Sequence, residues 1–233
     1  MKYISIICVR GGSKGFPKKN IHKLNGKSLL ARAIEIAKDN KKISRVIVST
    51  DSQEFASIAL ENGAEVPFMR PSELAEDGSP EWLVWRHAIE YLENDGETNF
   101  SLVVLPVTAP LRNTSDVDRC IEEFESSEAD AVITVTEANR SPYFNMVNLD
   151  NNGYSSLVIK PRDIVTRRQD APEVFDMTTI AFIVSASFVK LNNNLFEGKV
   201  RSVMIPKERS IDIDTPYDME IAEFLAKKLE GAK

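Results

Sequence analysis

The sequence predicts an α/β protein with a doubly wound, mostly parallel sheet whose two faces are both covered by helices. Short apolar, β-branched runs alternate with segments in which apolar residues recur at helical spacing. The apolar runs are continuous, as in Ile4, Ile6 and Ile7, and this pattern is typical of strands buried on both faces. A chain of 233 residues can bury one substantial core, so we expect a single domain over residues 1–233.

Each element has its own local signal. Strands are expected at β-branched apolar runs, and helices at spacing such as that of Leu29 and Ile34, with Asp51 or Ser52 placed to cap the second helix. In chain order we predict a strand at 3–9, a helix at 28–38, a strand at 45–48, a helix at 52–60, a strand at 64–69, a helix at 81–93, a strand at 100–105, a helix at 114–126, strands at 131–136, 179–184 and 200–205, and a helix at 215–229.

The alternation stops between residues 139 and 175. This stretch is polar and rich in Pro, Asn and Arg, and it contains only short extended pieces. The strand pattern resumes directly afterwards. We therefore predict an insertion that leaves the sheet and re-enters it, in preference to a second domain.

Composition and charge exclude several classes of protein. The chain has 29 Lys and Arg against 35 Asp and Glu, a net charge of −6, which argues against a dedicated nucleic-acid binder. No stretch approaches the roughly 20 apolar residues of a membrane span, and the N-terminal run is too short for a signal peptide. Cys8 and Cys120 are far apart in sequence, so a disulfide framework is not expected. We expect a reduced, cytoplasmic protein that binds neither nucleic acid nor membrane.

A basic, glycine-containing loop follows the first predicted strand. Residues 10–27 contain six basic residues and no acidic one. Glycines at 11, 12 and 15 allow backbone N–H groups to approach an anion, and Arg and Lys side chains bind phosphate oxygens. The spacing matches neither a P-loop, because Ile21 stands where its first glycine is required, nor Gly-x-Gly-x-x-Gly. We favour a phosphate site over a surface turn with solvated lysines.

An acidic pair lies near the C-terminus. In an extended segment Asp212 and Asp214 point to the same side, because side chains repeat every two residues. Paired carboxylates suit Mg²⁺, which is completed by water and substrate phosphates. The alternative is that Asp214 caps the following helix while Asp212 is solvated. A basic phosphate loop together with a metal site is what phosphoryl or nucleotidyl transfer requires.

The residues of this loop, from Arg10 to Asn20, resemble the first motif of the acylneuraminate cytidylyltransferases, the CMP-sialic acid synthetases. Further motifs of that family follow in the same order along almost the whole chain. They are Ser49-Thr50-Asp51, Arg70-Pro71, Leu74-Ala75-x-Asp77, Thr108-x-Pro110-Leu111-Arg112 and Ser210-Ile211-Asp212-Ile213-Asp214-Thr215.

The resemblance implies a Rossmann-like nucleotidyltransferase fold and a reaction in which CTP and an acidic nine-carbon sugar give a CMP-sugar and pyrophosphate. It also implies a homodimer in which the insertion at 139–175 reaches the partner subunit, and Mg²⁺ held by Asp212 and Asp214. The residues that it assigns to the nucleotide are Arg10, Gly11, Gly12, Ser13, Lys14, Lys19, Asn20, Arg70 and Asp77. The catalytic set is Arg10, Lys14, Lys19 and Asp214, and the sugar-binding set is Arg168, Gln169, Thr178 and Phe182.

Departures from the family pattern fall on the sugar side. Pro106 stands where sialic acid enzymes commonly have a glutamine, residues 176–179 replace Arg-Pro-Asn-Gly, and Phe182 replaces a tyrosine. We therefore expect a sialic-acid-like nonulosonic acid, with legionaminic acid, pseudaminic acid or another relative as candidates rather than N-acetylneuraminic acid, and the sequence leaves the choice among them open. A cytidylyltransferase for an eight-carbon 3-deoxy sugar acid, another nucleotide-sugar pyrophosphorylase and a non-catalytic nucleotide-binding protein are the alternatives.

Overall fold

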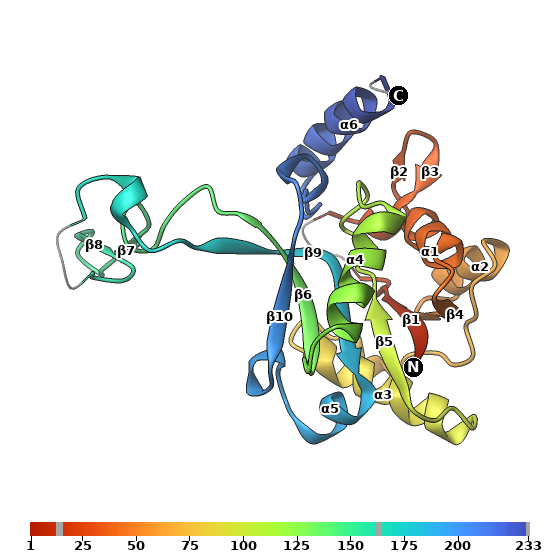
Figure 1. Cartoon of the computed structure of the whole chain (residues 1–233). Coiled ribbons are helices and arrows are strands. Elements are labelled where there is room, and N and C mark those ends of the chain that lie inside the picture. The colour runs from red at the N-terminus through yellow and green to blue at the C-terminus, as the bar shows by residue number, and fades with distance from the viewer. Residues whose placement is uncertain (13–15, 162–164, 232–233) are drawn as a thin grey trace.

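The computed structural model describes residues 1–12, 16–161 and 165–231. Its centre is a six-stranded sheet in the order β10-β6-β9-β5-β1-β4 (Figure 1). The strands are β1 (Lys2–Cys8), β4 (Ile43–Ser49), β5 (Phe100–Val104), β6 (Ala131–Glu137), β9 (Phe175–Ser185) and β10 (Val200–Met204). Strand β1 runs parallel to β4 and β5, and β10 runs parallel to β6, whereas β9 is antiparallel to both of its neighbours. The mostly parallel α/β fold is confirmed.

Helices cover both faces of the sheet. They are α1 (Leu29–Asp39), α2 (Gln53–Glu61), α3 (Glu81–Asn94), α4 (Thr114–Glu125), α5 (Ala186–Leu191) and α6 (Pro216–Gly231). One core cluster joins the sheet to α1, α2, α4 and α6, and a second joins its other face to α3 and α5. Successive residues of β1 alternate between them: Tyr3 and Ile7 belong to the first cluster, and Ile4 and Ile6 to the second. The continuous apolar pattern of the strand follows from this burial on both faces.

Side chains cap the helices that begin near the site. Ser52 accepts a hydrogen bond from the backbone N–H of Phe55, so Ser52 and not Asp51 caps α2. Ser28 caps α1 in the same way, and Asn113 and Asp116 form a reciprocal capping box on α4. These caps fix where each helix starts relative to the strand before it.

The structure differs from the predicted elements in several places, and α5 is one helix that was not predicted. The strand predicted at 64–69 is wrong: a single parallel bridge joins Glu65 to Ile47, after which the chain leaves the sheet edge and Phe68 packs on Tyr91. A hairpin of β2 (Lys23–Leu24) and β3 (Lys27–Ser28) was not predicted. Its turn has positive φ at both central residues, 48° at Asn25 and 80° at Gly26, which suits Asn-Gly.

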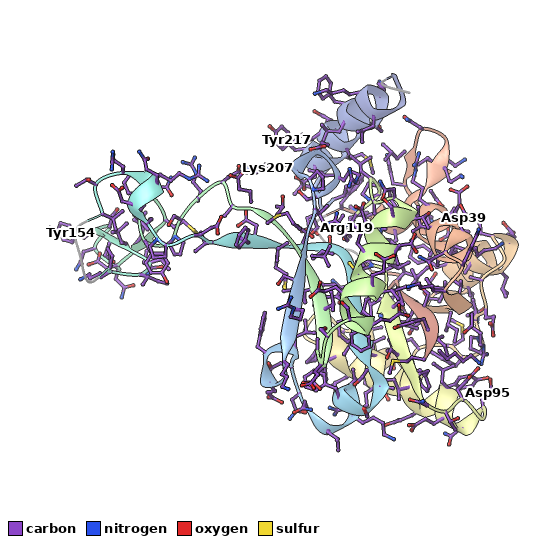
Figure 2. All side chains as sticks on the ribbon, viewed as in Figure 1. Asp39, Asp95, Arg119, Tyr154, Lys207 and Tyr217 are labelled. Carbon is purple, nitrogen blue, oxygen red and sulfur yellow. The ribbon has the colours of Figure 1, made fainter. Side chains whose placement is uncertain are left out.

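The described residues between β6 and β9 form an arm that stands away from the body of the molecule (Figure 1). It carries the small hairpin of β7 (Val147–Leu149) and β8 (Ser155–Leu157). Tyr154 lies at the far end of this arm in Figure 2 and is 75% exposed, and Leu149 is 70% exposed. The insertion expected at 139–175 therefore leaves the sheet and returns to it, whereas its contact with a partner subunit stays a prediction.

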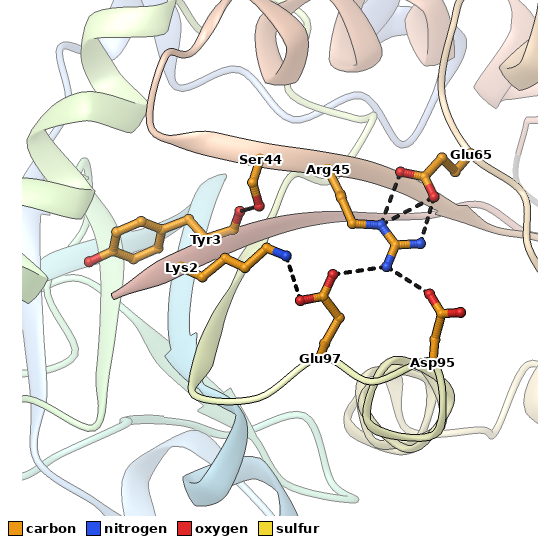
Figure 3. Close-up of polar contacts among 7 residues, drawn as sticks. All are labelled: Lys2, Tyr3, Ser44, Arg45, Glu65, Asp95 and Glu97. Carbon is orange, nitrogen blue, oxygen red and sulfur yellow. Dashed lines mark hydrogen bonds and ion pairs between the residues drawn. The ribbon is translucent and has the colours of Figure 1, made fainter.

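A network of ion pairs joins β1, β4 and the end of α3 (Figure 3). The guanidinium of Arg45 donates to Glu65 at 2.6 Å, to Asp95 at 2.9 Å and to Glu97 at 3.0 Å, and Lys2 pairs with Glu97. The network lies near the amino ends of the strands. Among the helices of the described residues, none has the length and apolar character needed to cross a membrane.

Candidate functional site

A cavity of about 490 Å³ lies at the carboxyl ends of β1 and β5. In sheets of this type ligands bind beyond the carboxyl ends of the strands. Six of the residues predicted for the site line this cavity: Arg10, Lys19, Asn20, Arg70, Asp77 and Phe182. Its remaining lining comes from Cys8, Leu74, Glu76, Ser79, Glu81, Val84, Pro106, Val107, Thr108, Met177 and Thr179.

Lys19 and Asp214 form the contact that joins the two ends of the sequence. Lys19 lies in a short 3₁₀ helix, Lys19–Ile21, and its side chain is only 10% exposed. Its Nζ donates to Oδ1 of Asp214 at 2.8 Å, although the two residues are 195 positions apart. The Asp214 side chain is 71% exposed. The nearly buried ammonium group of Lys19 thus lies beside the exposed carboxylate of Asp214.

The loop after β1 is braced by its own side chains and by α2. The side-chain amide of Asn20 donates to the backbone carbonyl of Arg10 at 3.2 Å, and Arg10 forms an ion pair with Asp77. The backbone N–H of Gly11 donates to Asp51 at 2.9 Å. A Cβ at this glycine would lie 3.2 Å from that of Ser52, so the close approach of the loop to α2 favours glycine.

Two predictions for this loop need restating. The backbone N–H of Gly11 was expected to face phosphate, but in this structure it donates its hydrogen bond to Asp51. Gly12 is exposed. Ser13 and Lys14 lie outside the described residues. Among the described basic residues of 10–27, only Arg10 and Lys19 line the cavity. The others are exposed lysines, of which Lys18 pairs with Glu54 and Lys27 with Glu35, whereas no ion pair is described for Lys23.

The acidic segment is held in place by the residue between its two carboxylates. Ile213 is fully buried, and its backbone N–H donates to the carbonyl of Thr108 at 2.8 Å. Asp212 accepts a hydrogen bond from the hydroxyl of Thr179 at 3.0 Å. The alternation of apolar and acidic residues therefore reflects one apolar anchor flanked by two carboxylates. Both carboxylates bond to residues that line the cavity.

The start of α6 shows which residue caps it. The hydroxyl of Thr215 accepts from the N–H of Asp218 at 3.3 Å, and Asp218 accepts from the N–H of Thr215 at 2.8 Å. The alternative that Asp214 caps this helix is wrong, and its carboxylate bonds to Lys19 instead. Burial acts to raise the pKa of Asp218, but hydrogen bonds from Thr215 and Asp214 and the charge of Lys19 outweigh it, so the pKa is lowered.

A buried charge cluster supports this segment from behind. Arg209 donates to the fully buried Asp116 through two nitrogens, at 2.8 and 3.0 Å. Arg112 is buried beside them and donates to the carbonyls of Ala109 and Ile180. Burial lowers the pKa of Arg112 to about 9, while the charges of Asp116 and Asp212 oppose that change. Sequence reasoning found the motif that contains Arg112 but missed Asp116 and Arg209.

Arg70 lies at the β4 side of the cavity. It is buried, its Nε donates to the hydroxyl of Ser49 at 3.1 Å, and its Nη2 donates to the Ser49 carbonyl at 2.6 Å. Cys8 and Glu81 line the same part of the cavity. Burial raises the pKa of the Cys8 thiol, so the thiolate is disfavoured there. Sequence reasoning did not select Glu81, because an acidic residue in the first turn of a helix is common.

The four residues predicted for the sugar are divided among three places. Phe182 lines the cavity. Thr178 does not fit the prediction, because its hydroxyl donates to Thr134 at 2.8 Å inside the sheet, and its neighbour Thr179 lines the cavity instead. Arg168 and Gln169 line a separate hollow of about 360 Å³ at the base of the arm. Within one chain these two residues do not line the main cavity.

Comparison with known families decides the identity of the fold and its chemistry. The family described as "Cytidylyltransferase" matches residues 4–224. The chain belongs to the cytidylyltransferase family. The family expected from the sequence motifs is thereby confirmed, and with it nucleotidyl transfer from CTP.

Relatives of this cytidylyltransferase act on several sugar acids. It is 36% identical over 221 residues to a CMP-N,N'-diacetyllegionaminic acid synthase of Campylobacter jejuni, with 94% of this chain and 92% of the relative covered. It is 30% identical over 235 residues to a pseudaminic acid cytidylyltransferase of the same species, with 97% of each chain covered. A solved CMP:2-keto-3-deoxy-manno-octonic acid synthetase complexed with CTP has the same fold, with a TM-score of 0.70, 15% identity, and coverage of 98% of this chain and 100% of that one.

Proposed function

We propose that this cytidylyltransferase transfers CMP from CTP to the anomeric hydroxyl of a nine-carbon, sialic-acid-like sugar acid and releases pyrophosphate. The observation that carries the proposal is the contact between Lys19 and Asp214 beside the cavity. It brings the phosphate-binding loop and the acidic pair together, as nucleotidyl transfer requires. The names of the legionaminic and pseudaminic acid relatives support the class of acceptor.

The nucleotide would be held by exchange of ion pairs. Arg10 is paired with Asp77 and Lys19 with Asp214 in this structure. A triphosphate carries more negative charge than either carboxylate and presents several acceptors, so both cations can turn to it. Arg70 would contact the cytosine, and Asn20 would keep the loop in shape through its bond to Arg10. Ser13 and Lys14 remain proposed members of this phosphate site.

Mg²⁺ is the proposed cofactor, with Asp212 and Asp214 as its protein ligands. The donor chemistry fits, because the two carboxylates offer hard oxygen ligands. Among the described residues no group of three or more His, Cys, Asp or Glu is placed to hold a metal. The remaining ligands would therefore come from water and from the phosphates of the substrate. When bound, the ion supplies positive charge that offsets the negative charge of the phosphates.

The chemistry is an in-line displacement at phosphorus. The oxygen of the anomeric hydroxyl forms a bond to the α-phosphorus while the bond from that phosphorus to the bridging oxygen of pyrophosphate breaks. The hydroxyl proton passes to water, and the electron pair of the broken bond remains on pyrophosphate. Lys19, with Lys14 and Arg10, would stabilise the charge that grows on this leaving group. The tight packing around Lys19 keeps its ammonium group oriented before the substrate arrives.

The lining opposite Arg70 suits an acylated and weakly hydroxylated part of the sugar. Pro106, Met177 and Phe182 present apolar surface there, and Thr179 provides a hydroxyl. The described residues on this side of the cavity offer no amide or phenol donor, so sugar hydroxyls placed there stay unpaired, at about 1–3 kcal/mol for each buried group. An acceptor with two acetylated amines, such as the one named for the N,N'-diacetyllegionaminic acid relative, suits such a surface better than one with a single acetyl group. We therefore favour legionaminic or pseudaminic acid over N-acetylneuraminic acid.

We further propose that the arm packs on a second copy of the chain. Its hairpin exposes several apolar side chains, among them Val147, Leu149 and Tyr154. Packing there would remove this surface from water and could bring Arg168 and Gln169 to the partner's cavity. Light scattering after size exclusion should give twice the chain mass. Leu149→Asp together with Tyr154→Asp should give the monomer, and a monomeric parent protein would contradict this proposal.

An acceptor panel tests the function. Pyrophosphate release is measured with CTP, Mg²⁺ and, in turn, N,N'-diacetyllegionaminic, pseudaminic, N-acetylneuraminic and 3-deoxy-manno-octulosonic acid. The largest kcat/KM is expected with one of the first two acids. Turnover with the eight-carbon acid alone would contradict the proposed acceptor. Binding of CTP without turnover on any acceptor would favour a non-catalytic nucleotide-binding protein.

A further inference from the structure

Glu81 is a carboxylate in the cavity that phosphate binding does not explain. It is the first residue of α3 and lines the cavity together with Arg70 and Cys8. A carboxylate repels a triphosphate, so a cavity that binds CTP has no use for Glu81 at its phosphate end. Glu81 interacts with Cys8 and with the charge of Arg70. Cys8 pairs with Ser49 of β4, and Ser49 accepts hydrogen bonds from the guanidinium of Arg70, so Glu81 lies at the β4 side of the cavity.

The surroundings of Glu81 make it sensitive to a hydrogen-bond donor. Glu81 is exposed and lines the cavity, and desolvation by the protein around it raises the pKa of its carboxyl group. The indole of Trp85, the charge of Arg70 and the thiol of Cys8 act in the opposite direction by favouring the ionised form. A ligand that covers this carboxylate displaces water from it, so the ligand has to donate hydrogen bonds in place of that water.

Cytosine and uracil differ in the group that they would present to the carboxylate of Glu81. Cytosine carries a 4-amino group, which donates, whereas uracil carries an oxygen at the same position, which accepts. A carboxylate accepts from the amino group of cytosine and repels the O4 of uracil. Arg70 beside it can donate only, which suits the O2 and N3 acceptors of cytosine.

We propose that Glu81 accepts a hydrogen bond from the 4-amino group of cytosine and so contributes to the selection of CTP over UTP. The inference rests on the proposed function, in which Arg70 contacts the base. One direct contact to a base edge is worth about 1–3 kcal/mol of discrimination. Since 1.36 kcal/mol is tenfold, this corresponds to a preference of about 5- to 150-fold.

Calorimetric titration of the full chain with CTP and with UTP, without any sugar, tests the contact. Glu81→Gln should reduce the ratio of the two dissociation constants by about 5-fold or more, because an amide can also donate to O4 of uracil. Glu73→Gln changes an exposed carboxylate of the same connecting segment and should keep the ratio of the parent protein. An unchanged ratio in Glu81→Gln would overturn the inference.

A second measurement changes the nucleotide and not the protein. The triphosphate of 2-pyrimidinone riboside lacks the 4-amino group, so the parent protein should bind it about 5- to 150-fold more weakly than CTP. Glu81→Ala should bind both ligands about equally. Equal binding of both by the parent protein would overturn the inference even if a Glu81 variant failed to fold. Because no sugar is present, a failure of the acceptor panel leaves this result unaffected, whereas failure of the parent protein to bind CTP would overturn both proposals.

Discussion

Asp116→Ala is expected to destabilise the protein and to weaken its activity from a position behind the cavity. The Asp116 side chain is fully buried, and it accepts two hydrogen bonds from Arg209 and one from the backbone N–H of Asn113. Its hydrogen bonds also raise the pKa of Arg209 above its usual value. Arg209 closes the 3₁₀ turn Lys207–Arg209, directly before the segment that carries the proposed metal ligands.

The structure sets the size of the effect. Removing one partner of a buried ion pair costs about 3–5 kcal/mol. Arg209 is 21% exposed and can turn toward water, which favours the lower end of that range. Loss of the capping box on α4 adds about 1 kcal/mol. A total of about 3–4 kcal/mol corresponds to a fall in Tm of about 6–16 °C in a protein of this size.

Urea unfolding and calorimetry measure the stability, and pyrophosphate release measures kcat/KM well below the lowered Tm. The matched control is Glu123→Gln on the same helix as Asp116. It breaks an ion pair of 2.6 Å with Arg201 of β10, whose side chain is 62% exposed. This control should cost less than about 1 kcal/mol. Asp116→Ala should also lower kcat/KM by about 10- to 100-fold through misplacement of the acidic segment. Equal and small effects of the two variants would refute the reasoning.

Three further outcomes are expected. Asp214→Asn should lower turnover by at least about 100-fold while CTP affinity changes only severalfold. The reason is that a lost charge contact to the reacting phosphates acts mainly in the transition state. Pre-steady-state kinetics measure the turnover, and calorimetry measures the CTP affinity. Because the pKa of Asp218 is lowered in the folded state, its ionised carboxylate stabilises the fold at pH values above the ordinary pKa of 3.8, and this contribution is lost as the pH falls below 3.8. The difference in stability between the parent protein and Asp218→Asn, measured by urea unfolding, should therefore shrink between about pH 5 and about pH 2. Arg45→Met should cost about 1–3 kcal/mol in urea unfolding because three carboxylates lose one shared partner, whereas Arg201→Met, which breaks one exposed pair, should cost less than about 1 kcal/mol.

The layered fold could be predicted because each strand and helix carries its own pattern of apolar residues. The strand predicted at 64–69 failed because strand formation depends on a neighbour, and the edge of β4 pairs with Glu65 alone. Thr178 and Thr179 show a second limit: the antiparallel pairing of β9 decides which of two adjacent threonines faces the cavity. A shift of one residue in strand pairing moves every side chain to the opposite face of the sheet. In a strand that is buried on both sides, the pattern of apolar residues does not show which face each residue occupies.

The candidate site shows the same limit in its charges. The basic block after β1 suggested a surplus of positive charge, but the fold supplies acids from distant segments. Asp77 pairs with Arg10, Asp214 pairs with Lys19, and Glu81 lies within electrostatic reach of Arg70. For Lys19 and Arg70, which are buried, an acid nearby offsets the cost of removing a cation from water. Binding of a triphosphate would then exchange carboxylates for phosphates at Arg10 and Lys19, and the release of Asp214 would supply a metal ligand as the phosphates arrive. Nucleotide and Mg²⁺ should therefore each bind more tightly in the presence of the other, because breaking the ion pair between Lys19 and Asp214 frees Lys19 for the phosphates and Asp214 for the metal.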